Sequence, residues 1–180
     1  MRARSALLTL LAAAFIPAGF AQGDPQEQME RVRKRVVTQG AVCPDPGQPC
    51  KLGSGAFKPN ELSFHAPRGF EFDRGEDRSQ PFYAVILRSS GALCVYDETP
   101  RLQVQALFPG RKVFAHRHLC DGFQDKVTYT NVDRTRGFLA VYAGATEAEA
   151  KAFLARVRAR RDFRDAYLRR MQVVVTWQVE

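Results

Sequence analysis

The sequence predicts an α+β domain: a mainly antiparallel sheet with two helices on one face, in the ferredoxin-like (split βαβ) order. Two observations lead to this prediction. From residue 81 onward, short apolar runs typical of strands alternate with two segments that carry helix-start signals. The order is strand, helix, strand with one extra, strand, helix, strand. The 180 residues are also enough to bury one hydrophobic core.

The first part of this domain contains a strand and a helix. Residues 82–87 (FYAVIL) are an apolar run typical of a buried strand, and residues 93–96 predict a short extension. Thr99 and Pro100 indicate a helix start, with Thr99 as the N-cap and Pro100 in the first helical position. Residues 109–110 (PG) indicate the helix end. Apolar and polar residues also alternate between these limits, which favours a strand as the alternative.

The second part contains three strands and a helix before the closing segment. Strands are predicted at residues 112–119, 126–132 and 137–143. Thr146 and Glu149 then form a capping box, in which each side chain binds a backbone N–H of the other residue. The apolar stripe of the helix that follows consists of Ala150, Phe153, Leu154 and Val157.

The closing segment, residues 166–179, is predicted as a single strand. Met171, Val173, Val175, Trp177 and Val179 alternate with a mostly polar set of residues. One face of this strand is therefore apolar and the other is largely polar, as in a sheet that is covered on one side.

The N-terminus predicts export. Arg2 and Arg4 precede a short apolar run that ends in Gly19-Phe20-Ala21, so residues 1–21 are predicted to be a signal peptide. The alternative is a membrane anchor, but the run is shorter than a bilayer span requires. We expect a periplasmic or secreted protein with no transmembrane segment after leader removal. Residues 22–80 are expected to form a polar arm and an irregular, disulfide-containing segment, and residues 81–180 the α+β domain.

Four cysteines predict a covalent framework in that oxidising compartment. Cys43 and Cys50 enclose three prolines and a glycine, a tight turn that a disulfide can close. A metal site is the alternative there, but no histidine is near in the sequence and the spacing fits no common zinc motif. The predicted topology places Cys94 and Cys120 at one end of the sheet, so they are expected to pair. Four cysteines allow three connectivities.

The charge favours an anionic partner. The formal net charge is +8, or +6 without the two arginines of the leader. Cell-wall polymer or lipid head groups are more accessible than nucleic acid to an exported protein, so we expect no nucleic acid partner. Seven arginines lie between Arg156 and Arg170, and arginine pairs well with carboxylates and phosphates. A solvated basic surface explains the same charges equally well.

Part of the chain resembles a known family. Residues 137–157 (GFLAVYAGATEAEAKAFLARV) and 166–175 (AYLRRMQVVV) are similar to the second half of a sporulation-related repeat (SPOR) domain. That half has a strand, a turn with a glycine such as Gly144, an Ala- and Glu-rich helix and a last strand. The resemblance covers about the last hundred residues, and residues 93–96 and 126–132 look like insertions. It implies an exported, non-catalytic module that binds cell-wall glycan on its sheet.

The candidate site residues come from two places. The histidine face of one strand and the polar edge of the closing strand supply the candidate ligand contacts His116, His118, Arg170, Gln172 and Thr176. His116, His118 and Cys120 would share one strand face and, with Cys94, match a Cys₂His₂ zinc set. An oxidising compartment favours a disulfide there instead, so we expect neither a metal nor another cofactor.

The remaining alternatives concern function. No G-x-S-x-G nucleophile motif is present, and an even number of cysteines disfavours a free catalytic thiol. We therefore expect a binding module that contacts cell-wall glycan or another anionic envelope polymer. A small secreted hydrolase or metal-dependent enzyme that uses His116 and His118 is one alternative. A domain that binds other envelope proteins is another.

Overall fold

The computed structural model describes residues 39–51, 57–65, 76–90, 97–116 and 126–176, all within one compact unit, Thr38–Glu180. The predicted signal peptide lies outside these residues. So do Cys94, His118 and Cys120, and with them the predicted Cys94–Cys120 pair.

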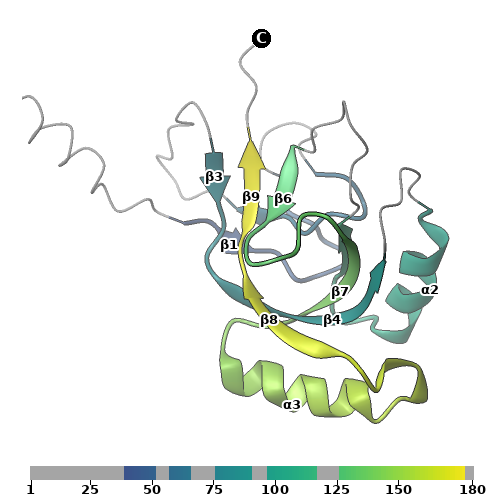
Figure 1. Cartoon of the computed structure of the whole chain (residues 1–180). Helices are drawn as coiled ribbons and strands as arrows, with labels where there is room; N and C mark the ends of the chain where they lie inside the picture. Colours follow the sequence, from purple (N-terminus) through teal and green to yellow (C-terminus); the bar gives the residue numbers. More distant parts are fainter. Residues whose placement is uncertain (1–38, 52–56, 66–75, 91–96, 117–125, 177–180) are drawn as a thin grey trace, which may run out of the picture. The chain divides into compact units, whose positions relative to one another are not determined.

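A four-stranded sheet forms the centre of this unit (Figure 1). Its strands, in spatial order, are β5 (Val113–His116), β7 (Gly137–Gly144), β4 (Phe82–Ser90) and β8 (Tyr167–Met171). Neighbouring strands are antiparallel. Because β4 and β5 both run antiparallel to β7, these two strands point the same way. The α+β class is thus confirmed.

Two helices cover one face of this sheet. They are α2 (Thr99–Leu107) and α3 (Glu147–Arg158), and a short 3₁₀ turn, Arg161–Phe163, follows α3. Val104 and Phe108 from the α2 region and Phe153 and Val157 from α3 are buried with sheet residues such as Val141. Figure 1 shows α3 across the sheet from β6 and β9. The helices therefore supply the cover that one apolar sheet face requires.

The start of α2 differs from the prediction. Glu98 is the N-cap, and Thr99 and Pro100 are already helical. The Thr99 amide donates a hydrogen bond to the Asp97 Oδ1 atom, 2.9 Å away. The predicted Thr99 cap is therefore wrong by one residue, because the preceding Asp97 satisfies the first free amide of the helix.

The start of α3 confirms the capping box. The Thr146 hydroxyl accepts a hydrogen bond from the Glu149 amide at 3.4 Å, and the Glu149 carboxylate accepts one from the Thr146 amide at 3.3 Å. The bonds from Thr146 hold the pKa of Glu149 below its usual value. Gly144, two residues earlier, has a φ of +144° and lies against the Glu149 side chain, which favours glycine there.

Removing this cap should destabilise the domain moderately. We expect Thr146→Ala to lower the free energy of unfolding by about 1 kcal/mol, because the Glu149 amide loses its acceptor. Thr146→Ser keeps a hydroxyl and should lose less than half of that. Urea unfolding followed by circular dichroism measures both variants. Equal losses in the two variants would contradict the hydrogen-bond explanation.

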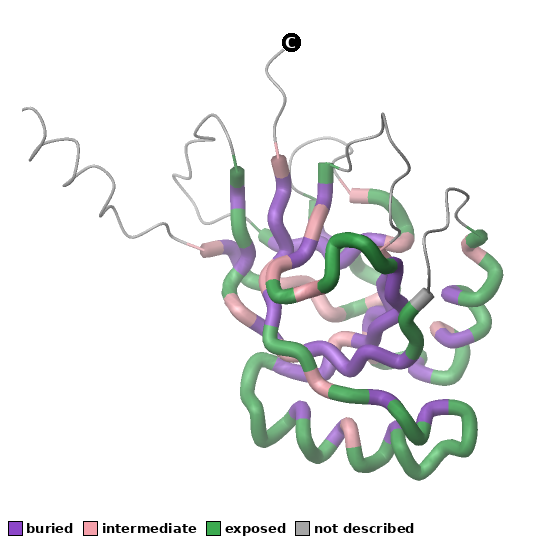
Figure 2. The backbone as a smooth tube through the Cα atoms, in the orientation of Figure 1, coloured by how far each residue is buried: buried purple, intermediate pink, exposed green. Residues whose placement is uncertain are grey.

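The second face of the four-stranded sheet is also largely covered. A two-stranded sheet, β1 (Ala41–Val42) with β2 (Phe64–His65), and a three-stranded sheet pack on this side. The latter has the order β3 (Glu76–Arg78), β9 (Val173–Thr176), β6 (Val127–Tyr129). This second layer joins its buried residues with those of the central sheet in one core: Leu62, Phe64, Phe82, Ala84, Ile86, Phe114, Val127, Tyr129, Phe138, Ala140, Met171, Val173 and Val175. Figure 2 shows this burial along β6 and β9.

The closing segment forms two strands where one was predicted. β8 belongs to the four-stranded sheet and β9 to the three-stranded sheet, with Gln172 between them. The backbone amide of Gln172 donates to the Thr130 hydroxyl at 2.9 Å. The side-chain amide of Gln172 donates to the Ser79 carbonyl at 2.8 Å. These contacts with other segments bend the chain from one sheet into the other. The predicted alternation is retained, since Met171, Val173 and Val175 all enter the same core.

Candidate functional site

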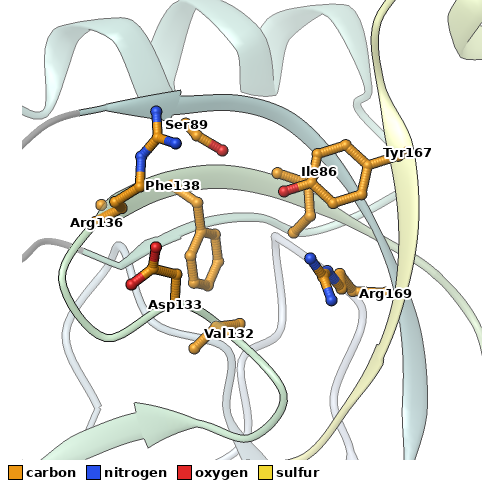
Figure 3. A pocket seen from close by; sticks show the side chains of 9 residues that line it. Ile86, Ser89, Val132, Asp133, Arg136, Phe138, Tyr167 and Arg169 are labelled. Atoms are coloured by element: carbon orange, nitrogen blue, oxygen red, sulfur yellow. The ribbon is translucent and has the colours of Figure 1, made fainter.

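The candidate site is a small cavity on the helix-free side of the four-stranded sheet, where the second layer leaves β4, β7 and β8 partly open (Figure 3). Its volume is about 140 Å³. It is lined by Ile86, Ser89, Val132, Asp133, Arg136, Gly137, Phe138, Tyr167 and Arg169. In the view of Figure 3, Arg136 and Asp133 lie on one side of the Phe138 ring, and Tyr167 and Arg169 lie on the other.

Strand parity places Tyr167 and Arg169 in this cavity. Side chains alternate between the two faces of a strand, and Met171, two residues beyond Arg169, enters the core on the helix-free side. Leu168 packs with the core under the helices. Tyr167 is paired with Ile86 of β4 and is 37% exposed. The Arg169 guanidinium lies 5.3 Å from the centre of the Tyr167 ring, so the two side chains form one surface.

The β6–β7 connection supplies the opposite wall. Asn131 adopts a φ of +57°, which asparagine tolerates better than most residues, and its side chain donates to the Arg170 carbonyl at 3.0 Å. Asp133 accepts hydrogen bonds from the Thr135 amide and hydroxyl, at 2.9 and 2.6 Å. The Arg136 amide donates to the Asp133 carbonyl. These local bonds shape the turn and hold Asp133 and Arg136 at the rim.

This lining suits a polyhydroxylated ring. Tyr167 and Phe138 offer apolar ring surface, and two guanidinium groups, the Ser89 hydroxyl and the Asp133 carboxylate offer donors and acceptors. The volume is below the roughly 300–1,000 Å³ of pockets for drug-sized ligands, so a single ring is the size that fits. Asp133 is the one carboxylate among the described lining residues, whereas glycoside hydrolysis commonly uses a pair.

The predicted contact residues occupy different parts of the fold. His116 ends β5 beside this area, half-buried, with its ring 5.6 Å from that of Phe138 and 5.9 Å from that of Tyr129. Arg170 is exposed on β8, on the parity opposite to Arg169. His118 lies outside the described residues.

Gln172 and Thr176 take part in backbone pairing. Gln172 links Thr130 and Ser79 as described above, and the Thr176 amide donates to the Lys126 carbonyl at 2.8 Å. Among the described residues, the predicted contacts thus lie on three different strands, with His116 on β5, Arg170 on β8 and Thr176 on β9. Tyr167, Arg136 and Asp133 were missed. Tyr167 could have been found from the sequence, because Tyr167, Arg169 and Met171 are two residues apart and therefore share one face of the strand.

The predicted Cys43–Cys50 disulfide is present, with the two Cα atoms 5.8 Å apart. The pairing of β1 with β2 also brings His65 close to this disulfide. The two sulfur atoms and a ring nitrogen of His65 lie within 4.8 Å of one another. No histidine is near Cys43 and Cys50 in the sequence, but His65 is near them in the tertiary structure. Since both sulfurs are used in the disulfide, His65 is left as the one potential metal ligand of this group.

The arginine-rich segment is spread over several elements. Arg156 and Arg160 lie over the rings of Phe153 and Phe108, with 5.6 and 5.3 Å from guanidinium carbon to ring centre. The Arg158 side chain donates to the Ala166 carbonyl at 2.8 Å. These three residues are exposed around the end of α3, so they stabilise that helix end as well as adding charge.

Among the helices of the described residues, none has the length and apolar character needed to cross a membrane. No protein-family model, curated protein or solved structure matches this chain.

Proposed function

We propose that this protein is an exported, non-catalytic module that binds cell-wall glycan, with one sugar ring in the cavity beside Tyr167 and Arg169. The observation that carries the proposal is the lining of this cavity, in which aromatic ring surface and fork-shaped cationic donors face the same small space. Sugars present apolar C–H faces and hydroxyl groups together, so they match such a lining.

The position of the cavity on the sheet also supports the proposed glycan contact. The SPOR resemblance implies contact with glycan on the sheet, and the helices of this chain leave one side of the four-stranded sheet free. In this chain the second layer buries most of that side, including Phe82, Phe114 and Ala140. The cavity is a part that stays open, at the β4–β8 edge. We therefore restrict the proposed contact to this region. Export itself rests on the leader and on the presence of a disulfide.

Neighbouring arginines provide a matched test. Arg169 and Arg170 are both exposed on β8 and carry the same charge, but they lie on opposite faces of the strand. We expect Arg169→Ala, and likewise Tyr167→Ala, to weaken retention on purified, amidase-treated sacculi about tenfold, which corresponds to about 1.4 kcal/mol. Arg170→Ala should retain near wild-type binding, because its side chain is not in the cavity.

The comparison separates specific recognition from general charge attraction. Attraction of a basic protein to an anionic polymer would fall equally in Arg169→Ala and Arg170→Ala, and it would fade for all variants as salt is raised. Equal losses in these two variants, or no retention of the wild-type protein at low salt, would contradict the proposal. Circular dichroism of each variant shows whether its fold is intact.

A further inference from the structure

A second, larger cavity of about 410 Å³ lies between the disulfide-closed loop, the segment before β2 and helix α2. Its described lining is Pro46, Pro49, Cys50, Lys51, Phe57, Lys58, Pro59, Glu61, Ser63, Arg101, Leu102, Gln105 and Lys112. The two cavities have no described lining residue in common, so this cavity is treated separately from the proposed glycan contact.

Much of the wall is apolar. Three prolines, Phe57 and Leu102 contribute ring and aliphatic surface. Leu102 is 53% exposed although it belongs to a helix that is otherwise anchored in the core. Leu107, on the same helix, is 40% exposed, yet it does not line the cavity. An apolar ligand body would thus remove Leu102 from water, which is favourable in proportion to the area covered.

Two of the lining residues are buried charged residues. Lys112 and Arg101 are only 6% and 5% exposed. The Lys112 ammonium donates to the Pro59 carbonyl at 2.6 Å, and an ammonium has three N–H donors. Arg101 forms an ion pair with Glu98 and donates to the Val113 carbonyl at 3.2 Å. Burial, followed by the repulsion of Arg101, lowers the pKa of Lys112 below its usual value, and Glu98 and Glu61 oppose this.

The charge balance of the cavity favours an anion. Lys51, Lys58, Arg101 and Lys112 line the cavity, while Glu61 is the one carboxylate of its described lining and Glu98 is paired with Arg101. A carboxylate placed beside Lys112 would favour the charged form of this amine and offset the repulsion from Arg101. The four cationic residues exceed Glu61 and Glu98 by two charges, and among the anions that this excess can accept, a carboxylate costs less desolvation than a doubly charged group.

We propose that this cavity binds a small carboxylic acid with an apolar chain, its carboxylate at Lys112 and its chain against Leu102 and Phe57. The volume lies within the range of small-molecule sites, which combine an apolar lining with a few placed polar groups. This assigns the disulfide-closed loop a role as a wall of a ligand site.

The test uses octanoate as the probe and the purified protein in isothermal titration calorimetry. We expect octanoate to bind at one site per chain, and octanol and octylamine to bind at least tenfold more weakly, because they lack the carboxylate. Equal affinity for octanoate and octanol would overturn the proposal, and so would the absence of octanoate binding.

Two matched variants locate the site. Leu102→Glu and Leu107→Glu each replace an exposed leucine of α2 and change the net charge by the same amount. Of these two residues, only Leu102 lines the cavity. We expect Leu102→Glu to weaken octanoate binding at least tenfold and Leu107→Glu to change it less than twofold. Similar effects of both variants would place the ligand elsewhere and overturn the proposal. Retention of Leu102→Glu on sacculi should equal that of wild type, which keeps this test separate from the glycan proposal.

A third variant tests whether the Lys112 ammonium binds the carboxylate. Lys112→Met should reduce octanoate affinity at least tenfold while octanol affinity stays within twofold, which a merely weakened cavity would not show. Because Lys112 is buried and bonded to Pro59, this variant is compared only if its circular dichroism matches wild type. The Leu102→Glu comparison decides the proposal in either case.

Discussion

Replacing Phe114 by alanine is expected to lower the free energy of unfolding by about 3–5 kcal/mol. Phe114 of β5 is fully buried. Its ring centre lies 5.1 Å from that of Tyr129, 6.1 Å from that of Phe138 and 6.2 Å from that of Phe82. Tyr129 belongs to β6, so this ring joins the four-stranded sheet to the second layer. Its removal leaves a space that neighbours on two different sheets cannot easily fill.

Urea unfolding of Phe114→Ala against wild type measures this loss. Leu107→Ala is the control, because Leu107 is an exposed leucine on α2 and should change the unfolding free energy by less than about 0.5 kcal/mol. A loss below about 1 kcal/mol in Phe114→Ala would mean that the second layer does not pack on the sheet as described. The position of the smaller cavity, which includes Phe138, would then be in question as well.

Loss of the Cys43–Cys50 disulfide is expected to cost about 2.5 kcal/mol, the chain-entropy estimate for closing a loop of about eight residues. Two backbone bonds tie this loop to the domain. The Cys43 amide donates to the Ser63 carbonyl at 2.9 Å, and the Lys112 amide donates to the Pro44 carbonyl at 2.8 Å. Opening the loop therefore also loosens the wall of the larger cavity, and octanoate binding should weaken in parallel.

The double variant Cys43→Ser, Cys50→Ser tests this by urea unfolding under non-reducing conditions. Asp45→Ala is the matched control, because it keeps the disulfide and removes only the hydrogen bond from the Gly47 amide to the Asp45 carboxylate, 2.7 Å long. It should cost less than about 1 kcal/mol. If the double variant were as stable as Asp45→Ala, the disulfide would not hold the loop as inferred.

The residue pattern predicted the elements well wherever their signals are local. The capping box at Thr146 and Glu149 involves residues three apart, so its geometry follows from helix formation alone. The stripe of Ala150, Phe153 and Val157 is buried as expected for the same reason. The predicted N-cap of α2 was wrong by one residue. The Thr99 amide donates to the Asp97 carboxylate, and Thr99 is already part of the helix.

The candidate site was predicted less well, because it depends on long-range contacts. Alternation over residues 166–179 indicated strand structure, but it cannot show that Gln172 meets Thr130 and Ser79 and leaves the first sheet there. His65 and the disulfide are distant in sequence and adjacent through the β1–β2 pairing.

Composition and local periodicity thus predicted an α+β chain and a disulfide-closed turn, which the structure confirms, while the expected export signal lies outside the described residues. The tertiary structure alone decided that a second layer covers most of the helix-free sheet face, leaving the Tyr167 cavity open. It also decided that Lys112 is buried and lines another cavity. The reason is physical. Secondary structure follows from neighbours a few residues apart, whereas cavities and buried charges are set by which distant apolar faces cover one another.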